Sequence, residues 1–204
     1  MAEVDRIAIS NKAALAAGVG TIDSLVSPST AEETFCSQWY EVIVESEISL
    51  YRWKFATKTF NLTPNLLVTE PDTKHNVAYQ MPSDVLSVDT VLVDKTPIEF
   101  DRYQDEIHTT DTSGDTVYLK YRYRPDESDW NPYFTQLIIY RLATMLSFSI
   151  ARRDDVASSM KQLADEHWRR AKTEDAQSRT NDKVNLTRIV RGRGGTLDKF
   201  WRNR

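Results

Sequence analysis

Cysteine and histidine are scarce in this chain of 204 residues, and their scarcity excludes several kinds of site. The single cysteine, Cys36, rules out a disulfide within the chain and a cysteine cage for a metal ion. The three histidines, His75, His108 and His167, lie far apart in the sequence, and none has a second ligand at metal-binding spacing. We expect the first two in loops and the third on a helix face. The sequence therefore predicts no metal site and no cofactor.

Long apolar runs and the common catalytic motifs are also lacking. No apolar stretch approaches the ~18 residues of a membrane span, and the first residues lack the basic and apolar regions of a signal peptide. No glycine-rich loop stands between a strand and a helix, and no serine has the surroundings of a nucleophile elbow. Carboxylates are numerous but spread along the chain. The sequence therefore favours a protein that is not an enzyme, and a small hydrolase with scattered carboxylates is one alternative.

Charge is divided unevenly along the chain. The net charge is −4 overall, but residues 179–204 hold eight Lys or Arg and two acidic residues, which is a net charge of +6. The first 178 residues therefore carry a net charge of −10. A basic segment that follows an acidic body suggests contact with an acidic partner or with phosphate.

One long helix, from Thr30 to about Phe55, has the strongest pattern in the chain. Its apolar side chains recur at spacings of three and four, which places them on one stripe of a helix. The stripe consists of Cys36, Trp39, Ile43, Ser46, Leu50 and Trp53. Ser29 with Glu32, or Thr30 with Glu33, stands in capping-box register at the helix start. We expect Trp39 and Trp53 to lie in the protein core.

Three further helices are predicted. Residues 5–17 form a short one, which ends at glycine, and residues 155–178 form the last one. Between them, Pro132 to Arg152 is apolar almost all round, which is typical of a helix at the centre of a bundle or between subunits.

Residues 57–125 change to a strand-like composition. Val117, Leu119 and Tyr121 alternate with polar or more exposed residue types, which predicts a strand with one buried face. Residues 112–115 are the expected hairpin turn before it. We predict an antiparallel sheet of about four or five strands, inserted between the helices.

The fold class predicted is therefore α+β. Residues 1–56 and 126–178 form a body of about four helices, residues 57–125 form an antiparallel β-rich lobe, and residues 179–204 form an extended arm. The arm combines basic and apolar side chains, which favours docking on another protein. We expect the contact at Arg188, Ile189, Val190, Arg191, Arg193, Leu197, Phe200 and Trp201. Its Arg-Gly stretch leaves RNA binding open as an alternative.

An ordered series of short motifs carries a family resemblance over about residues 7–178. It comprises Ile9–Leu15 with Gly18, Gly20–Ile22 and Ser24–Leu25; Ala31–Tyr40 leading to Trp53-Lys54-Phe55-Ala56; Tyr79–Asp84; and Tyr121 with Asp129–Phe134. The series resembles the tail tubular protein A family of short-tailed bacteriophages, the adaptor proteins of the head-to-tail connector. The motif and core residues of this resemblance are Trp39, Trp53, Phe55, Tyr79, Pro82 and Phe134. Ala16-Ala17 and the basic tail depart from the family pattern.

The resemblance implies a structural role in the virion, at the head–tail junction, after synthesis in the host cytoplasm. Copies of the chain would form a homo-oligomeric, twelve-fold ring between the portal protein and the tail nozzle. The ring would close the packaged head and pass double-stranded DNA at ejection, with no sequence-specific binding and no small-molecule substrate. In this interpretation the arm binds the portal protein. A nucleic-acid-binding module that acts through the basic arm is the alternative.

Overall fold

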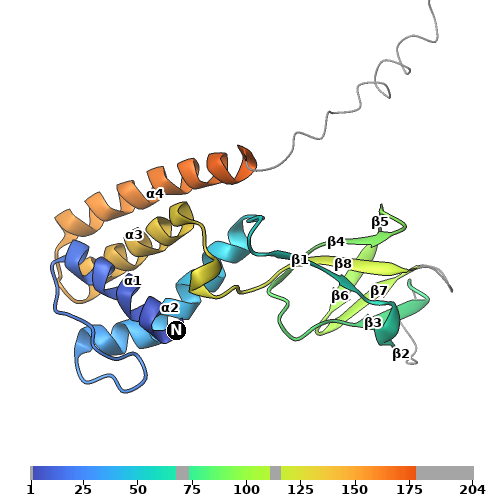
Figure 1. The fold of residues 1–204 in the computed structure, drawn as a ribbon, viewed down its shortest axis with the longest axis horizontal. Helices are drawn as coiled ribbons and strands as arrows, with labels where there is room; N and C mark the ends of the chain where they lie inside the picture. Colours follow the sequence, from blue (N-terminus) through green and yellow to red (C-terminus); the bar gives the residue numbers. More distant parts are fainter. Residues whose placement is uncertain (1, 68–73, 111–115, 178–204) are drawn as a thin grey trace, which may run out of the picture.

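A computed structural model describes residues 2–67, 74–110 and 116–177 (Figure 1). Two helices, two small antiparallel sheets and two further helices follow one another along the chain. The predicted α+β class is confirmed. The predicted hairpin turn at 112–115 and the arm from residue 179 onward lie outside the described residues.

The described helices and strands have the following bounds. The long helices are α1 (Ala2–Ala17), α2 (Ala31–Leu50), α3 (Pro132–Ser149) and α4 (Asp154–Gln177), and short 3-10 helices span Thr63–Asn65 and Glu127–Asp129. The strands are β1 (Thr57–Asn61), β2 (Leu66–Leu67), β3 (Val77–Gln80), β4 (Ser87–Val93), β5 (Thr96–Ile98), β6 (Phe100–Tyr103), β7 (Glu106–Thr109) and β8 (Val117–Arg122).

Helix α2 begins at the predicted capping box. The Thr30 hydroxyl accepts a hydrogen bond from the Glu33 amide at 3.2 Å, and the Glu33 carboxylate accepts one from the Thr30 amide at 3.2 Å. The same carboxylate accepts bonds from the amides of Ser29 at 2.7 Å and Asp23 at 2.9 Å. Hydrogen bonds from the Ser29 and Asp23 amides lower the pKa of Glu33 to about 2. One buried carboxylate therefore fixes both the start of α2 and the loop before it.

The end of α2 differs from the prediction. The helix stops at Leu50 rather than near Phe55, because Tyr51 adopts an extended backbone conformation with φ of −141°. The Trp53 ring then folds back on the last turn, where its Nε1 donates to the Glu47 carbonyl at 2.9 Å. This hydrogen bond fixes the Trp53 side chain to the last turn of α2.

Aromatic rings form the core at this corner of the helical body. Trp53 and Phe134 are fully buried, with ring centroids 5.2 Å apart in an edge-to-face arrangement. Phe55 lies 5.0 Å from Phe134, and Trp130 lies 5.0 Å from the same ring on another side. The expectation that Trp53 lies in the core between α2 and α3 is therefore confirmed.

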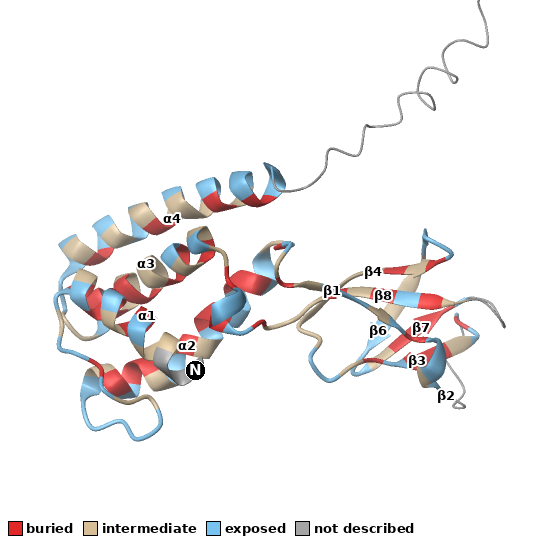
Figure 2. Ribbon diagram, viewed as in Figure 1, coloured by how far each residue is buried: buried red, intermediate tan, exposed pale blue. Residues whose placement is uncertain are grey.

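The expectation for Trp39 is wrong. Its side chain is 41% exposed, and Val42 and Leu50 are exposed as well. The buried stripe of α2 is rotated by about one residue and consists of Phe35, Cys36, Tyr40, Ile43, Val44, Glu47 and Ile48. Figure 2 shows the two faces of α2, one buried and one exposed. The rotation buries Tyr40, whose hydroxyl donates to Glu127 at 3.2 Å.

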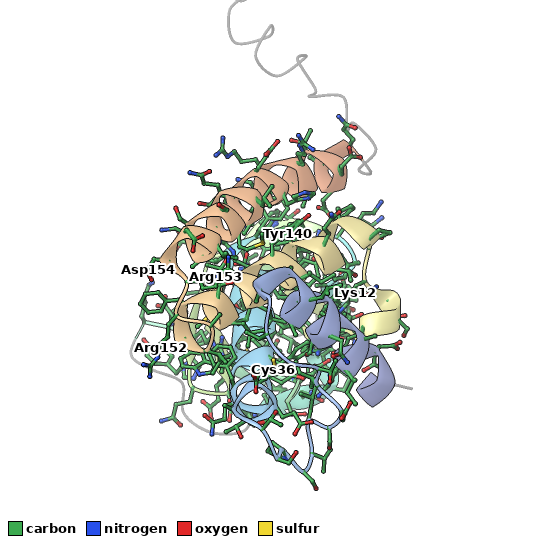
Figure 3. All side chains as sticks on the ribbon, turned by 90° about the vertical axis from the view of Figure 1, so that its left-hand side faces the viewer. Lys12, Cys36, Tyr140, Arg152, Arg153 and Asp154 are labelled. Carbon is green, nitrogen blue, oxygen red and sulfur yellow. The ribbon has the colours of Figure 1, made fainter. Side chains whose placement is uncertain are left out.

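Helix α3 lies at the centre of the helical body, as its all-round apolarity predicts. It contacts α1, α2 and α4, and seven of its residues are buried (Figure 1). It ends at Ser149 rather than Arg152, because Arg152 adopts a left-handed conformation with φ of 52°. Figure 3 shows Arg152 and Arg153 at the turn into α4.

The β lobe contains eight described strands in two sheets, so the expectation of four or five is wrong. The strand orders are β1-β8-β4-β5 and β2-β3-β7-β6, and every pairing is antiparallel. The missed strands are short: β2 has two residues and β5 has three. Such strands cannot show a readable alternation of apolar and polar residues.

The β lobe has its own hydrophobic core. The predicted alternation on β8 is confirmed, since Val117, Leu119 and Tyr121 are buried. Tyr79 of β3 is buried in the same core, and Pro82 follows it at the end of the strand. This core is separate from that of the helices, and the lobe projects from one end of the helical body (Figure 1).

Candidate interaction surfaces

Two sets of charged side chains join the β lobe to the helical body. In the first, Arg124, just after β8, binds Glu41 of α2 with its Nε 3.1 Å from Oε2. Arg124 also pairs with Glu127, and Arg6 of α1 bridges the two acids at 2.7 Å to Glu41 and 3.0 Å to Glu127. Burial alone would raise the pKa of Glu127, but the guanidinium of Arg124 outweighs it and holds that pKa below its usual value. Glu127 is therefore a paired structural carboxylate.

The second set fixes β8 to the C-terminal end of α2. Arg122 of β8 donates to the carbonyls of Ile48 and Ser49, which lie in the last turn of the helix. A cation is favourable at this end of a helix, where the unpaired carbonyls are partly negative. Arg122 Nε also lies 3.1 Å from the buried Asp89 carboxylate, and Arg52 reaches the same carboxylate at 2.9 Å. Asp89 of the β lobe thus receives two guanidinium groups, one of which also binds the end of α2.

Two of the histidines come together in the β lobe. His108 lies in β7 rather than in a loop, and its ring centroid is 6.4 Å from that of His75. His108 Nε2 lies 2.9 Å from Glu106, and His75 Nε2 lies 3.5 Å from Asp101. No local pattern marks this proximity, because it depends on strand pairing between distant segments. Strand β3, which begins just after His75, pairs with β7, and β6 sets Asp101 opposite His108. Among the described residues, no group of three or more His, Cys, Asp or Glu side chains could hold a metal ion.

Large apolar side chains are exposed on the helical body. Leu15 of α1 is 82% exposed, and Phe148 of α3 is 66% exposed. On α2, Trp39 and Val42 border a groove of about 360 Å³ that also reaches α3 and α4. Exposed apolar side chains that gather on one surface are typical of sites that contact another protein segment.

The predicted site residues fall into three groups. Trp53, Phe55 and Phe134 lie together in the core of the helical body, and Tyr79 and Pro82 belong to the β lobe. Trp39 lies apart from both cores, at the surface. The predicted contact residues of the arm, Arg188, Ile189, Val190, Arg191, Arg193, Leu197, Phe200 and Trp201, lie outside the described residues.

The sequence matches no known protein-family model and no curated protein sequence. Within the part of the chain that the structure describes, no helix is long and apolar enough to cross a membrane.

Proposed function

We propose that this chain is a structural adaptor of a phage head-to-tail connector. Copies of it would form a ring between portal protein and tail nozzle, close the packaged head and line part of the DNA ejection channel. The observation that supports this most is the division into a helical body and a projecting β lobe, each with its own core, held by a charged joint. A subunit built in this way offers separate surfaces to two different partners.

The helical body suits contacts between copies in a ring. Phe148 and Leu15 are large apolar side chains left in solvent, on helices that pack against each other. A ring requires a heterologous contact, in which one face of a subunit meets a different face of the next. The exposed side chains of α1 and α3 would supply one such face. The proposed stoichiometry is twelve, by resemblance to the family.

The β lobe and the arm would then meet the two axial neighbours. The lobe projects away from the helices (Figure 1), and we propose that this lobe contacts the tail nozzle. The arm leaves the helical body after Gln177, and its basic and apolar residues, Arg188 to Trp201, would bind the portal protein. The arginines would increase the association rate, and Phe200 and Trp201 would slow dissociation.

The acidic body suits a channel for DNA. Residues 1–178 carry a net charge of −10, so a duplex passing along their surface releases no counterions and gains no electrostatic affinity. The duplex can therefore slide without sequence-specific binding. The proposed location, in the virion at the junction of head and tail, follows from the family resemblance.

The proposal is tested by mixing the purified chain with a portal protein from the same phage and imaging the particles. Class averages with a second ring of density below the portal would support the adaptor role. A salt-sensitive gel shift with DNA or RNA, combined with no binding to portal, would support the alternative of a nucleic-acid-binding module acting through the arm.

A further inference from the structure

The groove on α2 is the most distinctive surface of the helical body that the joint and the cores leave unused. Its apolar wall is formed by Trp39, Val42 and Ile43 of α2 together with Met145 of α3. Arg141 and Lys161 complete it from α3 and α4. Trp39 is 41% exposed and Val42 is 52% exposed, so both apolar surfaces lose water contact only when something covers the groove.

A buried carboxylate also lines this groove. The side chain of Glu47 is 8% exposed, and its Oε1 accepts from Arg141 Nε at 2.7 Å. Its Oε2 has no hydrogen-bond donor among the described residues. A buried charged oxygen without a donor is unfavourable, so a donor brought in by a ligand would be bound strongly. Burial raises the pKa of Glu47, even though Arg141 opposes the effect.

The unpaired oxygen of Glu47 selects the kind of ligand. Glu47 is the one acid among the residues that line the groove, and Arg141 and Lys161 are its cations. Arg141 is already paired with Glu47 and Asp165, which leaves Glu47 Oε2 as the acceptor for a donor from outside. A segment that offers both a large apolar side chain and an N–H donor is therefore the complement of the groove.

The chain contains such a segment in its last residues. Residues 199–202 read Lys-Phe-Trp-Arg, with two aromatic side chains flanked by two cations, in an arm with a net charge of +6. Aromatic side chains bury a large apolar area on binding. The segment offers aromatic rings for the apolar wall of the groove and N–H donors for Glu47 Oε2.

The length of the arm allows it to reach the groove of its own chain. Along α4, Lys161 lies 16 residues before Gln177, which is about 24 Å at ~1.5 Å per residue. Residues 178–199 can span up to about 70 Å when extended. A tethered segment acts at a local concentration in about the millimolar range, far above that of a separate copy in dilute solution.

We propose that the groove between α2, α3 and α4 binds the C-terminal segment of the chain's own arm. Phe200 and Trp201 would cover Trp39, Val42 and Met145, and Lys199 or Arg202 would donate to Glu47. This contact does not require a ring or a portal protein. If the arm also binds portal, then groove and portal compete for it, and the groove retains the arm until portal is present.

Disulfide trapping in the full chain tests this contact. In a Cys36→Ser background, Ser46→Cys places a thiol in the groove, because Ser46 is exposed and lines it. Asn203→Cys places the second thiol two residues beyond Trp201. The matched control combines Asn203→Cys with Thr173→Cys, an exposed position on α4 that is closer to the root of the arm. Oxidation in a glutathione buffer is followed on non-reducing gels.

The groove pair should form an intrachain disulfide at least tenfold faster than the control pair, although the control thiol is nearer along the chain. Adding Trp39→Ala, at an exposed position, should bring the rate of the groove pair down to that of the control. Equal rates for the two pairs would overturn the proposal, because an undocked arm meets the nearer position at least as often. Interchain disulfides in place of intrachain ones would also overturn it, and would assign the groove to the arm of a second copy.

Discussion

Replacing Trp53 by alanine should destabilise the helical body more than replacing any exposed aromatic side chain. Trp53 is fully buried, and its ring lies 4.8 Å from Tyr51 and 5.2 Å from Phe134 between centroids. Truncation of a buried tryptophan costs about 3–5 kcal/mol. The hydrogen bond from Trp53 Nε1 to the Glu47 carbonyl would also be lost, at a cost of about 1 kcal/mol. For a chain of this length, a total loss of about 4–6 kcal/mol lowers Tm by roughly 8–24 °C.

The assay is urea or thermal unfolding followed by circular dichroism at 222 nm, which reports the helices. Trp39→Ala is the matched control, because it removes the same side chain from the same part of the chain at a 41% exposed position. We expect a loss of about 1 kcal/mol or less for the control. Trp53→Phe should fall between the two, since it keeps a ring but loses the N–H donor. Equal losses for Trp53→Ala and Trp39→Ala would refute the assignment of Trp53 to the core.

Three further predictions concern the loop, the joint and the arm. Glu33→Gln should lower Tm at pH 7. The difference in Tm between variant and wild type should shrink as pH falls from about 4.5 towards 2, because the native pKa of Glu33 lies below the unfolded value. A constant difference in Tm across this range would contradict the lowered pKa. Arg122→Met should cost about 2 kcal/mol and exceed Arg52→Met in unfolding experiments, since Arg52 is far more exposed; the reverse order would contradict the described joint. Deleting residues 186–204 should leave the helical signal unchanged while abolishing attachment to portal; wild-type portal affinity in the truncated chain would move the contact to the helical body.

Local signals in the sequence predict much of the fold. The Thr30 and Glu33 pair fixes the start of α2, and Pro132 marks the start of α3, because both depend on residues within one helical turn. The alternation on β8 is likewise local. These are patterns in which each residue acts on neighbours a few positions away.

The orientation of α2 and the candidate groove could not be predicted in this way. A period of 3.6 defines the width of a stripe but does not distinguish the adjacent Trp39 and Tyr40 as its buried member. In the structure Tyr40 points inward, and its hydroxyl bonds Glu127, which lies 87 residues further along the chain. In the sequence, Glu47 is indistinguishable from a surface glutamate. Its carboxylate is buried against the guanidinium of Arg141, which lies 94 residues further along the chain. Neither partner is marked by any local pattern.

The most direct test of the adaptor role is electron microscopy of the full chain purified together with a portal protein from the same phage. We expect class averages with twelve copies of this chain in a ring below the portal, with the β lobes pointing away from the portal. Particles of portal alone, at micromolar concentrations of both proteins and physiological salt, would contradict it.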